Sequence, residues 1–373
     1  MTTATESEIY GALMDSTFCY VQQKDHVSLL YTHDKTQAHA VWSIMDLTKK
    51  IIASTTVLFS VKFDKQKQLA RIERTGLGEN VLLGLKNKVS DITKHYPFHQ
   101  FNPYVGLFFK HNGNRNLYGY PFDFTDEIVQ TTKMVDSLNG FISDIRKDAN
   151  SKTFQTVLKN FRRSSEKNFS SFNNYITGLF KQHARMLVLR IDFGYKKEHV
   201  YEGKFDCSVP YEEVKQDREA LLSYLKKKIP LPSGSFLGYA WKLEFGLGKS
   251  YHHHVMIFLD GDKVREDVTI AKMIGDHWNT SITKDRGLYF NCNAFKDGYK
   301  QCGIGMVHFS NTFALEGLRK AALYMTKTDF FIKMVAPMND RCFGKSELPP
   351  PAPVKMGRPR TKAVMQATSF PAL

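Results

Sequence analysis

Three consecutive histidines stand at the start of a segment whose composition predicts a buried strand. Residues 255–261 are apolar and largely β-branched or aromatic, and they end on a turn-forming Asp-Gly pair. Because side chains alternate along a strand, His252 and His254 share one face and His253 takes the other. Two imidazoles side by side form two corners of a divalent-metal site. The alternatives are a basic surface run, or core histidines satisfied by backbone carbonyls.

A carboxylate in the preceding strand-like run is the candidate third ligand. If the glycine-rich loop between the two runs pairs Phe245 with Tyr251, Glu244 lies opposite His252 and shares its face. Cross-strand neighbours lie about 5 Å apart at Cβ, so Glu244, His252 and His254 can meet on one ion. A register shift of one residue would turn Glu244 to the other face. Such a site suits a non-haem iron oxygenase, a water-activating hydrolase, or a nuclease whose metal polarises a phosphate.

A lysine-rich and alanine-rich segment farther along predicts a helix that carries a candidate nucleophile. Tyr324 and Lys327 are three residues apart and therefore neighbours on one helix face, with Lys320 one turn earlier. A phenol with a pKa of about 10 is a weak nucleophile at neutral pH. A nearby ammonium group or a metal-bound phosphate favours its anionic form. The alternative is a tyrosine packed on the core, beside solvated lysines.

The order of these segments resembles the HUH endonuclease superfamily. An extended segment with Arg190 and Asp192 comes first, then Trp-x-Leu-Glu, the His-x-His strand and the helical Tyr-x-x-Lys. The resemblance covers about half of the chain, and the rolling-circle replication initiators related to the gene-two protein of filamentous phages (inoviruses) are the most similar group. The family usually has a bulky hydrophobic residue where this chain has His253. Asp192 is an alternative third ligand, although a role in fixing Arg190 or a loop ranks above it.

The resemblance implies an enzyme that nicks and rejoins single-stranded DNA at a specific sequence. Mg²⁺ or Mn²⁺, held by His252, His254 and Glu244, would polarise the scissile phosphate. Tyr324 would attack it, leaving a 5′-phosphotyrosine link and a free 3′-hydroxyl that a polymerase extends. The covalent link conserves the phosphodiester energy, so rejoining needs no ATP. Such an enzyme would initiate rolling-circle replication of a phage, satellite or plasmid.

The tyrosine helix carries further expected roles. Lys327 would steady the phenolate or the charge on phosphate oxygens, and Lys320 would contact DNA. No second tyrosine occurs between Phe313 and Lys333, which is typical of the one-tyrosine enzymes.

Other functions remain open from the sequence. A mobilisation relaxase or a single-strand transposase would use the same chemistry. A non-catalytic DNA-binding repressor would leave the metal site empty and Tyr324 dispensable. The sequence contains no phosphate-loop motif of a helicase, so a host helicase or supercoiling would open the origin DNA and a host polymerase would extend it.

The composition is compatible with a polyanionic partner. The 373 residues include 52 Lys and Arg against 37 Asp and Glu, giving a net charge of +15 and a pI near 9.4. Such an excess favours DNA, RNA or an acidic membrane surface. The five cysteines are scattered and odd in number and form no Cys-x-x-Cys pair, so they suggest neither a disulfide framework nor a zinc finger. Because we find neither a membrane-length apolar stretch nor a signal peptide, we expect a soluble protein of the bacterial cytoplasm with no membrane partner.

The pattern of elements predicts an α+β protein with two domains. Residues 1–150 predict an α+β accessory domain, in which origin DNA recognition is one possible role, and 147–170 predict either a polar junction or a basic helix near DNA. Residues 170–340 predict the catalytic domain, a split-βαβ arrangement with a central antiparallel sheet flanked by helices. The expected helices are 35–53, 125–147, 172–180, 211–228, 264–281 and 313–333, and the expected strands are 57–63, 103–109, 185–195, 236–245, 251–259, 287–292 and 304–309.

The C-terminal residues 348–373 predict a linker and a DNA-binding tail. The proline-rich start cannot form a helix and favours an extended chain. Lys355, Arg358 and Arg360 then surround a Gly-Arg-Pro sequence that resembles an AT-hook. In an AT-hook, an extended backbone lets arginines enter the minor groove of A·T-rich duplex.

Overall fold

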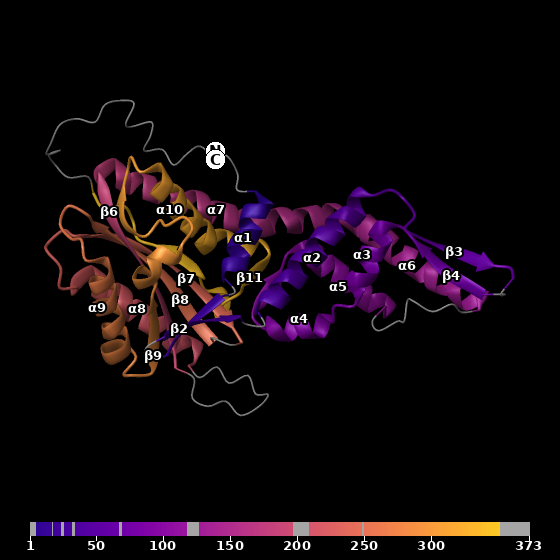
Figure 1. Cartoon of the computed structure of the whole chain (residues 1–373), viewed down its shortest axis with the longest axis horizontal. Helices are drawn as coiled ribbons and strands as arrows, with labels where there is room; N and C mark the ends of the chain where they lie inside the picture. The colour runs from indigo at the N-terminus through magenta and orange to yellow at the C-terminus, as the bar shows by residue number, and fades with distance from the viewer. Residues whose placement is uncertain are drawn as a thin grey trace. The chain divides into compact units, whose positions relative to one another are not determined.

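The computed structural model describes residues 5–16, 18–23, 26–31, 34–66, 69–117, 127–196, 209–247 and 250–350. The chain divides into two compact units (Figure 1). The first unit contains residues 1–32, 165–329 and 334–373, and the second unit contains residues 33–164 and 330–333. The expected accessory domain, residues 1–150, therefore includes an N-terminal segment, residues 1–32, that groups with the first unit.

The first unit is built on an antiparallel sheet with two long strands, β6 (Arg185–Tyr195) and β8 (Ser250–Asp260), near its centre. The strand order is β10 (Gly305–His308), β6, β8, β7 (Phe236–Gly246) and β12 (Phe343–Lys345). A further strand, β9 (Gly287–Asn291), also pairs with β6. All of these pairs are antiparallel. The expected α+β class, with a central antiparallel sheet flanked by helices, is confirmed.

Helices pack on both faces of this sheet. On one face, Phe172 and Tyr175 of α7 (Lys152–Gln182) contact Phe258 of β8, with ring centroids 6.2 Å and 5.8 Å apart. The helix α10 (Thr312–Lys327) lies over the same face and carries Tyr324. On the other face, Trp278 follows α9 (Asp267–His277) and packs 5.1 Å from Phe193. That face also receives α8 (Tyr211–Lys227), which contacts β7.

The tyrosine helix is shorter than the expected helix 313–333. It begins after Asn311, whose side chain accepts a hydrogen bond from the Ala314 amide, and it ends at Lys327. A 3₁₀ turn, Thr328–Phe330, follows, and then β11 (Ile332–Met334). The helix ends here because the next apolar residues, Ile332–Met334, form the strand β11, which pairs with β5 (His99–Phe101).

The second unit combines helices with a hairpin. Its helices are α2 (Asp34–Ala53), α3 (Gly76–Leu85), α4 (Val89–His95), α5 (Pro103–Arg115), α6 (Ile128–Ala149) and the part of α7 up to residue 164. The hairpin pairs β3 (Phe59–Asp64) with β4 (Leu69–Arg74). Three short elements precede this unit, namely the helix α1 (Glu6–Ser16) and the paired strands β1 (Phe18–Gln23) and β2 (His26–Tyr31).

The strand expected at 103–109 is wrong, because these residues form the start of α5. The Asn102 side chain accepts a hydrogen bond from the Tyr104 amide, and Pro103 occupies the first turn. An Asn cap followed by proline is a strong helix start, and it outweighs the strand propensity of the aromatic residues that follow. The segment 147–170 is mostly helical, because most of its residues belong to α7, and the boundary between the two units falls within it, between residues 164 and 165.

Candidate metal centre and tyrosine

The pairing of β7 with β8 follows the register expected from the loop length. Phe245 pairs with Tyr251, Glu244 with His252 and Lys242 with His254. On the other side of β8, Asp192 of β6 pairs with His254. Three neighbouring strands therefore place their polar side chains on one face of the sheet, beneath α10.

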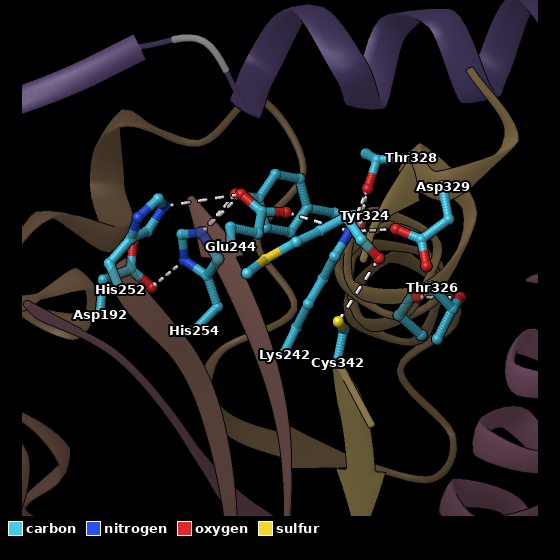
Figure 2. Close-up of polar contacts among 12 residues, drawn as sticks. Asp192, Lys242, Glu244, His252, His254, Tyr324, Thr326, Thr328, Asp329 and Cys342 are labelled. Carbon is cyan, nitrogen blue, oxygen red and sulfur yellow. Dashed lines mark hydrogen bonds and ion pairs between the residues drawn. The ribbon is translucent and has the colours of Figure 1, made fainter. Parts of the chain in front are cut away.

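The three expected ligand residues meet at one point of this face (Figure 2). His254 Nε2 lies 3.1 Å from Glu244 Oε2, and His252 Nε2 lies 3.6 Å from the same oxygen. The candidate ligand atoms of Glu244, His252 and His254 all lie within 4.8 Å of one another. This spacing allows a single ion to contact two imidazoles and one carboxylate.

The other ring nitrogen of each histidine has its own partner. His252 Nδ1 lies 3.1 Å from the Ser250 carbonyl oxygen, and His254 Nδ1 lies 2.7 Å from Asp192 Oδ1. The acceptors beside both Nδ1 atoms orient the rings so that both Nε2 atoms face Glu244. Metal-binding histidines are usually oriented in this way. Without an ion, the effect of burial is outweighed by Asp192 and Glu244, which raise the pKa of His254; a bound ion would displace the Nε2 proton. Asp192 faces the far nitrogen of His254, so the structure places it behind a ligand rather than among the ligands.

Charges of both signs control the ionisation of the carboxylates. Burial opposes the ionised form of Glu244, but Lys242 and His254 outweigh it and hold the pKa of Glu244 well below its usual range. The pKa of Asp192 is also lowered, because His254 and Arg190 outweigh the effect of burial. Both groups are therefore carboxylates at neutral pH and can bind a cation.

Tyr324 reaches this cluster from α10. Its hydroxyl lies 2.9 Å from His254 Nε2, and its side chain is buried, with 6% of the residue exposed. The guanidinium carbon of Arg190 lies 4.5 Å from the centre of the phenol ring. Burial, followed by the charge of Glu244, raises the pKa of Tyr324 well above its ordinary value. Without a metal ion, the tyrosine is therefore a phenol hydrogen-bonded to a candidate ligand.

Lys242 is a member of the cluster that sequence reasoning missed. Its side chain is 3% exposed, and its Nζ lies 3.0 Å from Glu244 Oε1 and 3.2 Å from Asp329 Oδ1. It also contacts the hydroxyl of Thr328. A signal was present, because Lys242 and Glu244 are two residues apart on one strand and must share a face. A lysine on the face of a buried carboxylate is an ion-pair candidate.

His253 occupies the opposite face of the sheet. It is fully buried and packs edge to face with Trp241, with ring centroids 6.2 Å apart. Burial, with a smaller effect of the Arg218 guanidinium, lowers the pKa of His253 to about 3. His253 is therefore a neutral core side chain, and the strand alternation separates it from His252 and His254.

The remaining expected site residues are not part of the cluster as the structure describes it. Lys320 is exposed on α10, and none of its described contacts links it to the cluster. The side chain of Lys327 lies outside the described residues, as do Lys355, Arg358 and Arg360.

The fold and the polar cluster define a class of protein, an α+β domain with a histidine and carboxylate site beside a buried tyrosine. The chain belongs to the YagK/YfjJ C-terminal domain family, whose profile matches residues 147–346, more than half of the chain. The matched region contains the whole cluster, from Asp192 to Asp329. No curated protein and no solved structure gives a significant match. Within the described residues, no helix is both long enough and apolar enough to cross a membrane.

Proposed function

We propose that this protein is a metal-dependent tyrosine endonuclease of the HUH type, which nicks and rejoins single-stranded DNA. One observation carries the proposal: the Tyr324 hydroxyl lies 2.9 Å from Nε2 of His254, one of three convergent ligand atoms. A nucleophile for phosphoryl transfer must lie within reach of the group that binds the phosphate. These two parts come from segments about 70 residues apart in sequence, so the chain spacing alone does not bring them together.

The residues present fit a divalent cation. Two imidazole nitrogens and one carboxylate oxygen converge, and both imidazoles are oriented by acceptors on their far side. We propose Mg²⁺ or Mn²⁺, held by His252, His254 and Glu244. When bound, such an ion polarises a phosphate and offsets the charge that develops on its oxygens.

The buried charges also match a cation together with a phosphodiester. The site face holds the carboxylates of Asp192, Glu244 and Asp329 and the cations of Arg190 and Lys242. When the histidines bind a metal ion they are neutral, and the negative charges of the side chains then exceed the positive ones by one. A divalent cation reverses this excess, and the single negative charge of a phosphodiester then brings the site to neutrality. Buried sites that are near neutral avoid the large cost of an unpaired charge.

The chain's own part in the reaction is the transfer of a phosphoryl group to Tyr324. Its phenolic oxygen forms a bond to phosphorus, and the bond from phosphorus to the 3′-oxygen breaks. The phenol loses its proton, and the 3′-oxygen gains one to become a free hydroxyl. One phosphodiester replaces another, so the reverse attack by a 3′-hydroxyl rejoins the strand. Arg190, stacked on the ring, stabilises the negative charge of the phenolate.

The solvent-facing side of the cluster sets the side from which DNA approaches. The side chains of Asp192 and Glu244 are 26% and 20% exposed, whereas that of His254 is 5% exposed. A scissile phosphate therefore enters along the two carboxylates rather than through α10. Because both are negative, the bound cation is needed to make this approach favourable.

The biological role proposed for this chemistry is initiation of rolling-circle replication of a phage, satellite or plasmid in the bacterial cytoplasm. The partners are origin DNA, a host helicase and a host polymerase. A mobilisation relaxase or a single-strand transposase would use the same site. A non-catalytic repressor with an idle site is the contrasting outcome of the test.

The test uses single-stranded oligonucleotides from the DNA element that encodes the protein, incubated with Mn²⁺. We expect a protein–DNA adduct that resists SDS, and Tyr324→Phe should abolish it while leaving DNA binding intact. Tyr289→Phe is the matched control, because the Tyr289 hydroxyl also donates a hydrogen bond, to Asp276 Oδ1 at 2.9 Å, but Tyr289 lies on β9 and not on α10. EDTA should prevent the adduct. An adduct that persists in Tyr324→Phe refutes the assigned nucleophile, and no adduct with any origin sequence favours the repressor.

A further inference from the structure

Lys242 is a buried charged side chain beside the candidate metal site whose ammonium group has three acceptors within contact. An ammonium group has three N–H donors and no acceptor. Lys242 Nζ contacts three acceptors, namely Glu244 Oε1 at 3.0 Å, Asp329 Oδ1 at 3.2 Å and the Thr328 hydroxyl. Its side chain is only 3% exposed. Because a buried ammonium is costly unless its donors are satisfied, these three contacts determine its position.

The ion pair of Lys242 with Glu244 leaves the two oxygens of the Glu244 carboxylate with different partners. Oε1 faces Lys242, whereas Oε2 faces the two imidazoles, 3.1 Å from His254 Nε2 and 3.6 Å from His252 Nε2. Figure 2 shows Lys242 approaching Glu244 from the side of Asp329, away from the histidines. Only one oxygen of the carboxylate is therefore turned toward the candidate metal position.

The same lysine contacts the end of the tyrosine helix. Thr328 and Asp329 follow α10 directly, and the Thr328 hydroxyl also lies 3.3 Å from the Tyr324 carbonyl oxygen. The ion pairs of Lys242 thus connect β7, which carries Glu244, with the turn of chain just after Tyr324. A shift of either element would cost one of the three contacts.

We propose that Lys242 is a positioning residue that reserves one oxygen of Glu244, so that the carboxylate offers a metal ion a single oxygen and leaves room on the ion for substrate. This inference rests on the metal site of the proposed function. A catalytic ion needs coordination positions that the protein does not occupy. If Lys242 were absent, Oε1 would be free to turn to the ion as well, as carboxylates often do. Its contacts to Thr328 and Asp329 keep the lysine in the position that prevents this.

The test compares the full-length protein with two variants. Lys242→Met alone leaves Asp329 as a buried carboxylate without its cation, so the informative variant is the double substitution Lys242→Met with Asp329→Asn. The single substitution Asp329→Asn is the matched control, since it keeps the pair of Lys242 with Glu244. Each protein is loaded with Mn²⁺ alone, without DNA, and the water-proton relaxivity reports how many water molecules exchange on the bound ion.

In an octahedral ion, three protein ligand atoms leave three water positions, and a fourth leaves two. We therefore expect the relaxivity of bound Mn²⁺ to fall by about a third in the double variant and to stay at the wild-type value in Asp329→Asn. Equal relaxivity in all three proteins would overturn the inference. Unchanged Mn²⁺ binding by Glu244→Ala would also overturn it, because Glu244 would then not be a ligand.

Adduct formation separates this inference from the proposed function. With origin DNA, we expect the single-turnover rate in the double variant to fall by about 10-fold to 100-fold, the range typical of residues that orient metal ligands. If the relaxivity changes as expected but the wild-type protein forms no adduct, Lys242 positions Glu244 in a metal site that has another function. If the adduct forms in wild type and at an equal rate in the double variant, the positioning role fails while the nicking function stands.

Discussion

His253 offers a quantitative test of which histidines belong to the metal site. It is fully buried on the sheet face opposite His252 and His254, beside Trp241. If it is a neutral core residue, His253→Leu should leave Mn²⁺ binding intact and should also reduce the sensitivity of the fold to acid. If it is a ligand, the same substitution should abolish Mn²⁺ binding.

The size of the acid effect comes from the depressed pKa. Burial lowers the pKa of His253 from 6.5 to about 3 in the folded protein. Between these two values the unfolded chain takes up a proton that the folded protein excludes. The stabilising effect of the neutral imidazole is therefore fully present above the unfolded pKa and is lost as pH falls from 6.5 toward 3. At about 1.4 kcal/mol per pH unit, a change from pH 7 to pH 5 lowers the free energy of unfolding by about 2 kcal/mol through this residue.

The assay is urea denaturation of the wild-type protein and His253→Leu at both pH values, with EDTA present throughout. Trp42 lies in the second unit, so a Trp42→Phe background leaves Trp241 and Trp278 to report on the unit that contains His253. Other titrating groups contribute to both proteins and cancel in the difference. We expect the variant to lose about 2 kcal/mol less than wild type on acidification. Equal losses would refute the buried neutral state, and lost Mn²⁺ binding would refute the assignment of ligands by strand alternation.

Two further predictions concern groups around the candidate site and the C-terminal tail. Asp192→Asn removes the charge that lies 2.7 Å from His254 Nδ1. We expect the affinity for Mn²⁺, measured by calorimetry, to fall by about 10-fold. An unchanged affinity would show that Asp192 does not orient His254. Truncation before Lys355 removes the basic tail, including Arg358 and Arg360, and should weaken duplex DNA binding most at low salt while sparing cleavage of a short single strand. Fluorescence anisotropy at two salt concentrations measures this effect, and equal duplex affinities would argue against the tail as a DNA contact.

Much of the site was predictable because it depends on local geometry. Side-chain alternation places His252 with His254, and the loop length places Glu244 opposite His252. The structure has this register. Lys242 was predictable by the same rule, since it shares a face with Glu244, but a lysine in a strand is more often exposed. Only its acceptors, which come from a distant segment, explain its burial.

The wrong secondary-structure predictions have two causes. At Pro103 one local sequence signal outweighed another, and at the end of α10 the cause is a contact with a distant strand, which the local sequence does not show. The aromatic residues after Pro103 favour a strand, but the Asn102 cap and the proline start a helix, and both signals are visible in the sequence. The end of α10 is different. Nothing within residues 328–334 shows that they leave the helix to pair with β5, because the partner strand lies more than 200 residues earlier.

The sequence by itself determined the strand faces, the spacing of the three candidate ligands and the positive charge, because these follow from the repeat of a strand and from composition. Only the tertiary structure decided which polar atoms meet. Tyr324 contacts His254, Asp192 lies behind the same imidazole, and Lys242 joins Glu244 to Asp329. Each of these contacts, apart from that of Lys242 with Glu244, joins segments far apart in the chain. The packing of α10 over the sheet brings Tyr324 and Asp329 to the site, and the pairing of β6 with β8 brings Asp192. No local periodicity of the sequence encodes these positions.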